Sequence, residues 1–201
     1  MRARLILWPA LYGALFALTF APLPLPAWSL AWVQLVVLAI AAHGAFSQTP
    51  KEAAITGLMF GLGTFVVGLY WLTISMHVYG QMALPLAWLA LLLFSLYLAL
   101  YPALAFGLTA WLLSGTDRVR PMSLLWMTTV WASAWTLTEM LRGVVFTGFP
   151  WLTTAYGQTD SWISGWSVLA GAAGTTWITA WIAGAVAATL AAEARQRDST
   201  V

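Results

Sequence analysis

Cysteine is absent from this chain of 201 residues, and charged residues make up only 7% of it. Without cysteine the chain can form no disulfide, no thiolate metal site and no cysteine nucleophile of its own. A soluble domain would carry roughly 25% charged residues, so the composition excludes a water-soluble globular protein. The formal net charge of +2 is too small to indicate a nucleic-acid-binding surface, and we expect no nucleic-acid partner.

Hydrophobic residues make up 62% of the chain, and 14 residues are Trp. A helix needs about 20 apolar residues to cross a bilayer, so the length leaves room for little besides membrane spans. We predict an all-α, polytopic integral membrane helix bundle of about six transmembrane helices, filling residues 1–192 before a polar cytoplasmic tail at 193–201. The predicted spans are residues 5–20, 28–46, 53–76, 86–113, 122–141 and 162–192.

The basic residues predict the orientation of these spans, because short cytoplasmic loops are enriched in Lys and Arg. With six spans, every basic residue except Arg142 lies on one side, which we therefore assign to the cytoplasm together with both termini. The residues on that side are Arg2, Arg4, Lys51, Arg118, Arg120, Arg195 and Arg197. An alternative for the first span is a cleaved secretory signal, but the prolines at 22, 24 and 26 make a poor cleavage region, which favours a retained anchor.

Glycines in the third span have a helical spacing. Gly57, Gly61 and Gly68 fall on one face of a helix, where small residues let a neighbouring backbone approach closely. We therefore predict that this face packs against another helix.

Glu139 and Arg142 form the one conspicuous charged pair near a predicted span, and charges at such depth are costly. Being three residues apart, they lie on the same helix face and can pair. One interpretation is an ion pair that closes the outer end of the fifth span. The other is that Arg142 binds a phosphate or carboxylate headgroup, which a guanidinium can hold through two hydrogen bonds.

The segment after Arg142 is apolar yet interrupted by Gly and Pro, which break helices. We expect it to dip into or lie on the outer leaflet, with Phe149 and Trp151 at the interface. Gly148, Pro150 and Tyr156 belong to the same candidate site, and His77 and Tyr79 reach the outer side as weaker candidates.

The candidate residues indicate no self-contained catalytic centre. Only two histidines occur, His43 and His77, and the predicted topology puts them on opposite sides of the membrane. We therefore expect no metal site and no cofactor. A Gly-x-Ser-x-Gly motif is also absent from the sequence.

Three blocks, at residues 138–143 (TEMLRG), 147–152 (TGFPWL) and 156–161 (YGQTDS), resemble the membrane domain of the bacterial apolipoprotein N-acyltransferases. Residues 68–72 (GLYWL) and 97–101 (YLALY) add to the resemblance. The resemblance covers nearly the whole chain. The block from Arg-Gly to Phe-Pro-Trp is fairly specific to the family, because neither a membrane span nor an ordinary turn requires these residues.

The resemblance implies a multi-pass protein of the bacterial inner membrane. Its family transfers an acyl chain from a phospholipid to the N-terminal diacylglyceryl-cysteine of a lipoprotein, through a thioester on a Cys that a Glu and a Lys activate. Those residues lie in a nitrilase-like periplasmic domain. This chain has no Cys, and its single Lys, Lys51, lies in a predicted cytoplasmic turn, so no catalytic residue can be carried over.

We therefore expect the membrane domain of an acyltransferase-like protein, truncated and inactive alone. Its partners would be phospholipid and either the lipoprotein substrate or a separate nitrilase-like chain. Glu139, Arg142 and residues 148–151 would seat headgroups or brace the catalytic domain. One alternative is a non-enzymatic lipid-binding or scaffold protein of the same fold. Another is a small transporter or membrane enzyme that uses Glu139 and His77.

Overall fold

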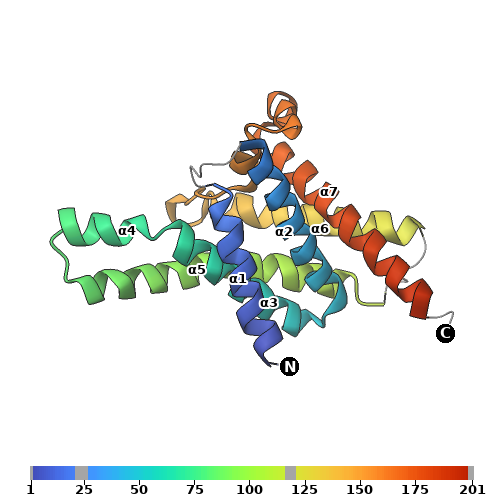
Figure 1. Ribbon diagram of the computed structural model, residues 1–201, viewed down its shortest axis with the longest axis horizontal. Coiled ribbons are helices and arrows are strands. Elements are labelled where there is room, and N and C mark those ends of the chain that lie inside the picture. The colour runs from blue at the N-terminus through green and yellow to red at the C-terminus, as the bar shows by residue number, and fades with distance from the viewer. Residues whose placement is uncertain (1, 21–26, 116–120, 199–201) are drawn as a thin grey trace.

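The computed structural model describes the backbone of residues 2–20, 27–115 and 121–198, and the side chains of residues 6–20, 29–115 and 123–193. The described residues form helices and turns and contain no strand, which confirms the predicted all-α class (Figure 1). The turn predicted after the first span, the centre of the loop at 114–121 and the polar tail lie outside the described side chains. So do the six arginines, from Arg2 to Arg197, on which the predicted orientation mainly rests.

Seven α-helices follow one another along the described chain, with shorter helical turns between them. The α-helices are α1 (Arg2–Leu18), α2 (Ala27–Ser47), α3 (Pro50–Gly68), α4 (Trp71–Ile74), α5 (Leu84–Leu112), α6 (Pro121–Arg142) and α7 (Trp166–Asp198). The shorter turns are the π-helical η1 (Ser75–Tyr79) and the 3-10 turns η2 (Val145–Thr147), η3 (Thr154–Gln158) and η4 (Trp162–Gly165).

Two of these helices differ from the predicted spans for local reasons. Helix α3 begins at Pro50, because Thr49 and Glu52 form a capping box in which each side chain accepts a hydrogen bond from the other's backbone N–H. The third predicted span, residues 53–76, is interrupted after Gly68 and continues as α4 and η1, with a bend of 47°. Helix α7 contains a second break at Gly171, whose φ of 63° is outside the helical range.

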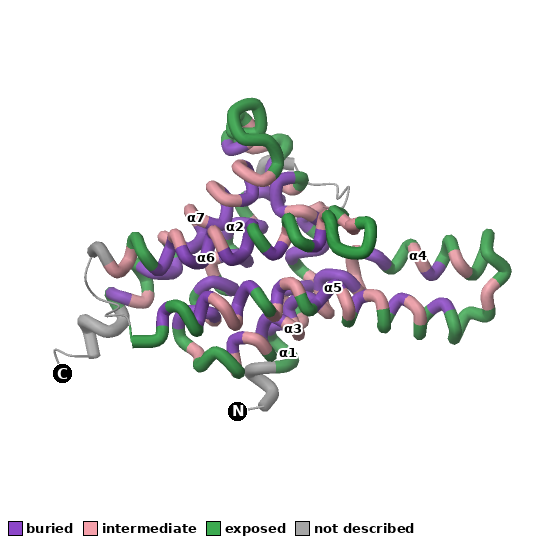
Figure 2. Tube along the Cα trace, turned by 180° about the vertical axis from the view of Figure 1, so that it is seen from behind, coloured by how far each residue is buried: buried purple, intermediate pink, exposed green. Residues whose placement is uncertain are grey.

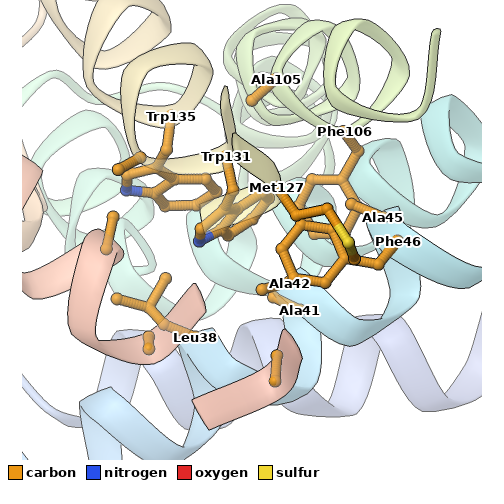
Figure 3. Close-up of a cluster of buried hydrophobic side chains, with 14 of the residues drawn as sticks. Leu38, Ala41, Ala42, Ala45, Phe46, Ala105, Phe106, Met127, Trp131 and Trp135 are labelled. Atoms are coloured by element: carbon orange, nitrogen blue, oxygen red, sulfur yellow. The ribbon is translucent and has the colours of Figure 1, made fainter. Parts of the chain in front are cut away.

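The core lies where α1, α2, α3, α5, α6 and α7 meet. Trp131 and Trp135 of α6 pack edge-on or tilted against Phe106 of α5, with ring centroids 5.3 and 6.4 Å away. Small residues on one face of α2 let the helices approach these rings (Figure 3). The α2 residues in this cluster include Leu38, Ala41, Ala42, Ala45 and Phe46. The burial of large rings against small side chains gives the bundle its interior packing.

The glycines of α3 pack as their spacing predicts. A Cβ on Gly61 would lie 2.7 Å from the Cα of Ala99, and one on Gly57 would lie 2.5 Å from the carbonyl oxygen of Pro102. Both neighbours belong to α5, so the absence of side chains at these positions lets α3 and α5 pack closely. Gly68 faces Leu152, whose side chain occupies the space that a Cβ would need.

Three described helices are long and apolar enough to cross a membrane, or four if the bent pair of α3 with α4 and η1 counts as one span. These three are Ser29–Ser47, Leu84–Leu112 and Trp162–Glu193, and the apolar part of α1, Ile6–Leu18, is shorter. Large apolar side chains are also exposed along α5, among them Leu93 and Leu100, as expected of a surface that faces lipid. The chain is therefore a multi-pass membrane helix bundle, while the number of six spans and their orientation stay predictions.

One arm of the molecule projects from the bundle. It consists of α4, η1 and the N-terminal part of α5, which lie side by side at one end of Figures 1 and 2. Helix α5 has 29 residues, so it is roughly 43 Å long, more than the hydrocarbon core of about 30 Å. With the predicted orientation, the tip of the arm would extend beyond the outer leaflet.

Candidate functional site

The candidate site lies at the end of α6, where the chain leaves the helix and folds back as residues 143–161. Arg142, the last residue of α6, is only 3% exposed. Its Nη1 donates hydrogen bonds to the carbonyl oxygens of Phe149 at 2.6 Å and Trp151 at 2.5 Å. The guanidinium carbon also lies 5.4 Å from the ring centroid of Phe65, within cation–π distance. The cation thus binds the returning segment to the bundle.

Glu139 binds the next part of the same segment. Its carboxylate accepts hydrogen bonds from the backbone N–H of Thr154, at 3.1 and 3.2 Å to the two oxygens, and from the Thr154 hydroxyl at 2.8 Å. Thr176 of α7 donates to it at 3.1 Å. Glu139 and Arg142 therefore form hydrogen bonds with different partners. Together the two side chains connect α6 to the returning segment and, through Thr176, to α7.

The backbone of the segment is strained where it turns. Phe146, Thr147 and Leu152 have positive φ values of 51°, 74° and 57°, a region that side-chain-bearing residues seldom adopt. At Gly148, with φ of 82°, a Cβ would collide with the carbonyl oxygen of Gly143. Only glycine both adopts this positive φ readily and lacks the Cβ that would collide. The hydrogen bonds of Glu139 and Arg142 hold the strained turn in place.

Aromatic contacts dock the tip of the segment on α4 and α5. Phe149 packs edge-on against Phe94 with ring centroids 5.0 Å apart, and Trp151 lies 5.7 Å from Trp71. Pro150, between them, is exposed. Phe149 and Trp151 therefore lie against helices on one side of the loop, and their place at the membrane interface stays a prediction.

A small cavity of about 20 Å³ is lined both by the charged pair and by residues of the core, and its volume suits one water molecule. Polar side chains line one part of it and aromatic rings the other. The polar ones are Thr64, Tyr101, Thr138, Glu139 and Arg142.

The other predicted site residues are divided between two places. Tyr156 is about half exposed, lies in η3 and lines one cavity together with Glu139. His77 and Tyr79 lie in η1, at the projecting arm, and the His77 Nδ1 is 2.8 Å from the carbonyl oxygen of Met82. The structure therefore does not bring His77 to Glu139, which argues against a centre that uses both. Among the described residues no group of His, Asp or Glu could hold a metal ion.

Sequence reasoning missed several polar partners of the site. Gln158 is fully buried and donates to the Gln34 Oε1 at 2.6 Å and to the Ala31 carbonyl at 3.3 Å, which ties η3 to α2. Thr154 also accepts from the Trp135 indole N–H at 2.9 Å. The sequence did offer a signal for Gln34, because it is an amide in an otherwise apolar span. Burying such a polar group in a membrane is costly unless it has a hydrogen-bond partner.

The fold and site together define a multi-pass helical membrane protein in which Glu139 and Arg142 bind the segment that folds back after α6. Comparison with known sequences gives the family. The family model for the apolipoprotein N-acyltransferase N-terminal domain matches residues 12–185. The chain belongs to the apolipoprotein N-acyltransferase family.

Individual relatives agree with this assignment. A putative apolipoprotein N-acyltransferase of Bordetella parapertussis is 43% identical over 180 residues, which cover 87% of this chain and 33% of the relative. The apolipoprotein N-acyltransferase of Ralstonia nicotianae is 43% identical over 187 residues, 92% of this chain and 34% of the relative. That of Vibrio cholerae is 34% identical over 182 residues, 89% of this chain and 33% of the relative. The chain spans about a third of the length of the curated relatives it matches.

Proposed function

We propose that this chain is the membrane part of an apolipoprotein N-acyltransferase-like protein of the bacterial inner membrane. In this role it presents phospholipid and a lipoprotein N-terminus to catalytic residues that lie outside these 201 residues. The observation that carries the proposal is the Arg142-bound segment 148–152, in a chain whose residues 12–185 match the family's N-terminal domain.

The residues of this chain supply binding and positioning. An apolar groove of about 600 Å³ lies beside the segment, between the ends of α1 and α3 and the aromatic rings of Trp71 and Trp151. A groove of this lining suits an acyl chain, because it offers apolar surface and no charge. Glu139 and Arg142 would fix the segment that forms one wall, which is the bracing role expected of them.

The 201 residues contain no Cys, so the thioester that the family resemblance implies cannot form on them. Acyl transfer would then need a nitrilase-like domain, in the same polypeptide or in a separate chain. The catalytic Cys of that domain would take the acyl group from the phospholipid ester and pass it to the substrate amine.

Reconstitution tests this proposal. The chain would be placed in vesicles with phospholipid and a diacylglyceryl-cysteine peptide, with and without the nitrilase-like domain of a relative, and the peptide mass measured. We expect no acylation by the chain alone or by the domain alone, and acylation by the mixture. Acylation by the chain alone, or none by the mixture, would contradict the proposal.

A second candidate is a lipid-binding or scaffold protein of the same fold, which the apolar groove also favours. The same reconstitution separates the two. A scaffold would retain phospholipid in the groove yet fail to support transfer by the added domain.

A further inference from the structure

Arg142 has hydrogen-bond donors that no described residue uses. Its bonds to the carbonyl oxygens of Phe149 and Trp151 both come from Nη1. A guanidinium has five N–H groups, and those on Nε and Nη2 have no partner within the described part of the chain. Unpaired donors on a buried cation are costly, so they point to a ligand beside them.

These donors reach the small cavity of about 20 Å³ that Arg142 lines. Arg142 is only 3% exposed, yet its Nε and Nη2 are not among the fully enclosed polar atoms that lack a partner. They therefore border a space that a molecule of solvent size can enter. The volume of the cavity suits one water molecule.

The charges around the cavity favour a neutral ligand. Glu139 and Arg142 both line it, so a bound anion would face the carboxylate and a bound cation would face the guanidinium. The Glu139 carboxylate already accepts hydrogen bonds from Thr154 and Thr176. It therefore balances the charge of Arg142 without accepting a hydrogen bond from the ligand.

The hydroxyls around the cavity offer acceptors to the same ligand. Thr64 and Thr138 line it, and their hydroxyl protons go to backbone carbonyl oxygens. Tyr101 of α5 also lines it, and its hydroxyl oxygen lies 2.7 Å from that of Tyr97. Because the charge of Arg142 attracts the oxygen end of a hydroxyl dipole, we expect Tyr101 to be the donor in this pair. The ligand must then accept from Arg142 and donate to a hydroxyl oxygen, and water does both.

We propose that the cavity binds one water molecule, which accepts hydrogen bonds from the Arg142 guanidinium and donates one to the Tyr101 oxygen. The hydrogen bonds then run from Arg142 through the water and Tyr101 to Tyr97, with every donor pointing away from the cation. Tyr101 is thus a positioning residue that connects α5 to the end of α6 through the water. The site goes beyond the proposed acyl-transfer role and does not depend on it.

Hydroxyl-radical labelling by X-ray radiolysis tests the site, because radiolysis of a bound water molecule oxidises the side chains beside it. The 201-residue chain would be irradiated in detergent micelles, and the oxidation of each Trp measured by mass spectrometry of its peptides. Trp135 and Trp131 of α6 are both almost fully buried (Figure 3). Trp135 lines the cavity, whereas Trp131 is not among its lining residues and has a fully enclosed indole nitrogen. We expect several-fold stronger oxidation of Trp135 than of Trp131.

Tyr101→Phe removes the acceptor hydroxyl and keeps the ring, so the oxidation of Trp135 should fall toward that of Trp131. Tyr97→Phe is the matched control, because Tyr97 carries the neighbouring hydroxyl on α5 but is not among the described residues that line the cavity. It should keep the wild-type ratio. The wild-type comparison of the two tryptophans needs no variant, so it decides the site even if Tyr101→Phe does not fold.

Equal oxidation of Trp135 and Trp131 in the wild type would overturn the proposal. So would a Tyr101→Phe protein in which Trp135 is oxidised as strongly as in the Tyr97→Phe protein. Because the assay contains no acyl acceptor and no catalytic domain, either result leaves the proposed acyl-transfer role to its own reconstitution test.

Discussion

Arg142 and Trp151 are joined by a hydrogen bond of 2.5 Å from the guanidinium Nη1 to the main-chain carbonyl oxygen. The same nitrogen reaches the carbonyl of Phe149. A side chain at the end of α6 thus fixes the backbone of the segment that carries the two aromatic rings docked on α4 and α5. The position of these rings depends on a cation that is itself buried.

Substitution of Arg142 should therefore release the segment. Arg142→Ala removes both bonds to carbonyl oxygens and should lower the free energy of unfolding by about 3 kcal/mol. Arg142→Lys keeps the charge but not the planar fork, and it should restore only part of the loss. Thermal unfolding in detergent would measure the stability, and limited proteolysis between residues 143 and 153 would measure release. The control is Lys51→Ala, at an exposed position, which should change neither the stability nor the proteolysis. If the segment of Arg142→Ala resisted the protease as well as that of the wild type, Arg142 would not be what holds the segment.

Thr154 and its neighbour Thr153 provide a test of the hydrogen-bond network around Glu139 and a control for it. Its hydroxyl donates to Glu139 and accepts from the Trp135 indole, so Thr154→Val leaves a carboxylate short of a donor and an indole N–H unpaired. We expect a loss of about 2 to 4 kcal/mol in unfolding free energy. Thr153→Val removes a single bond to the Pro150 carbonyl at a half-buried site and should cost about 1 kcal/mol or less. Equal shifts in the unfolding temperatures of the two variants would contradict the network.

The helices and the charged pair could be predicted from the sequence, because apolar runs and isolated charges are local signals. The resemblance located the segment at 147–152 by its residue types. The sequence did not show the interruption of the third span at Leu69–Tyr70, since both residues are apolar and compatible with a helix. That break places His77 and Tyr79 at the arm instead of near Glu139.

The threonines and glutamines of the site could not be assigned because their partners are set by tertiary structure. Thr154 and Thr176 look like ordinary polar residues until the returning segment places both beside Glu139. Gln34 and Gln158 are 124 residues apart, so no local pattern connects them. A threonine that caps a turn and one that binds a carboxylate have the same signature in sequence.

Gly148 should be intolerant of a side chain. Its φ of 82° is costly for alanine, by about 1 to 3 kcal/mol, and the new Cβ would also strike the Gly143 carbonyl oxygen. Gly115 is the natural control, because it has the same φ but no atom within 4 Å of the place that a Cβ would occupy. Gly148→Ala should therefore lower the unfolding temperature more than Gly115→Ala. A similar shift in both would mean that backbone strain alone, without the collision, sets the requirement at Gly148.

The buried contact between Gln34 and Gln158 predicts a non-additive pair of substitutions. Gln158→Leu alone leaves the Gln34 side-chain oxygen without its donor. Gln34→Leu alone leaves the Gln158 amide only its longer bond to the Ala31 carbonyl oxygen, so each substitution should cost about 1 to 3 kcal/mol. Replacing both with leucine removes the stranded groups together, and the double variant should be less destabilised than the sum of the two. Unfolding temperatures of the four proteins give the coupling. Because α2 and η3 contribute one partner each, additive effects would show that this bond does not hold the returning segment to α2.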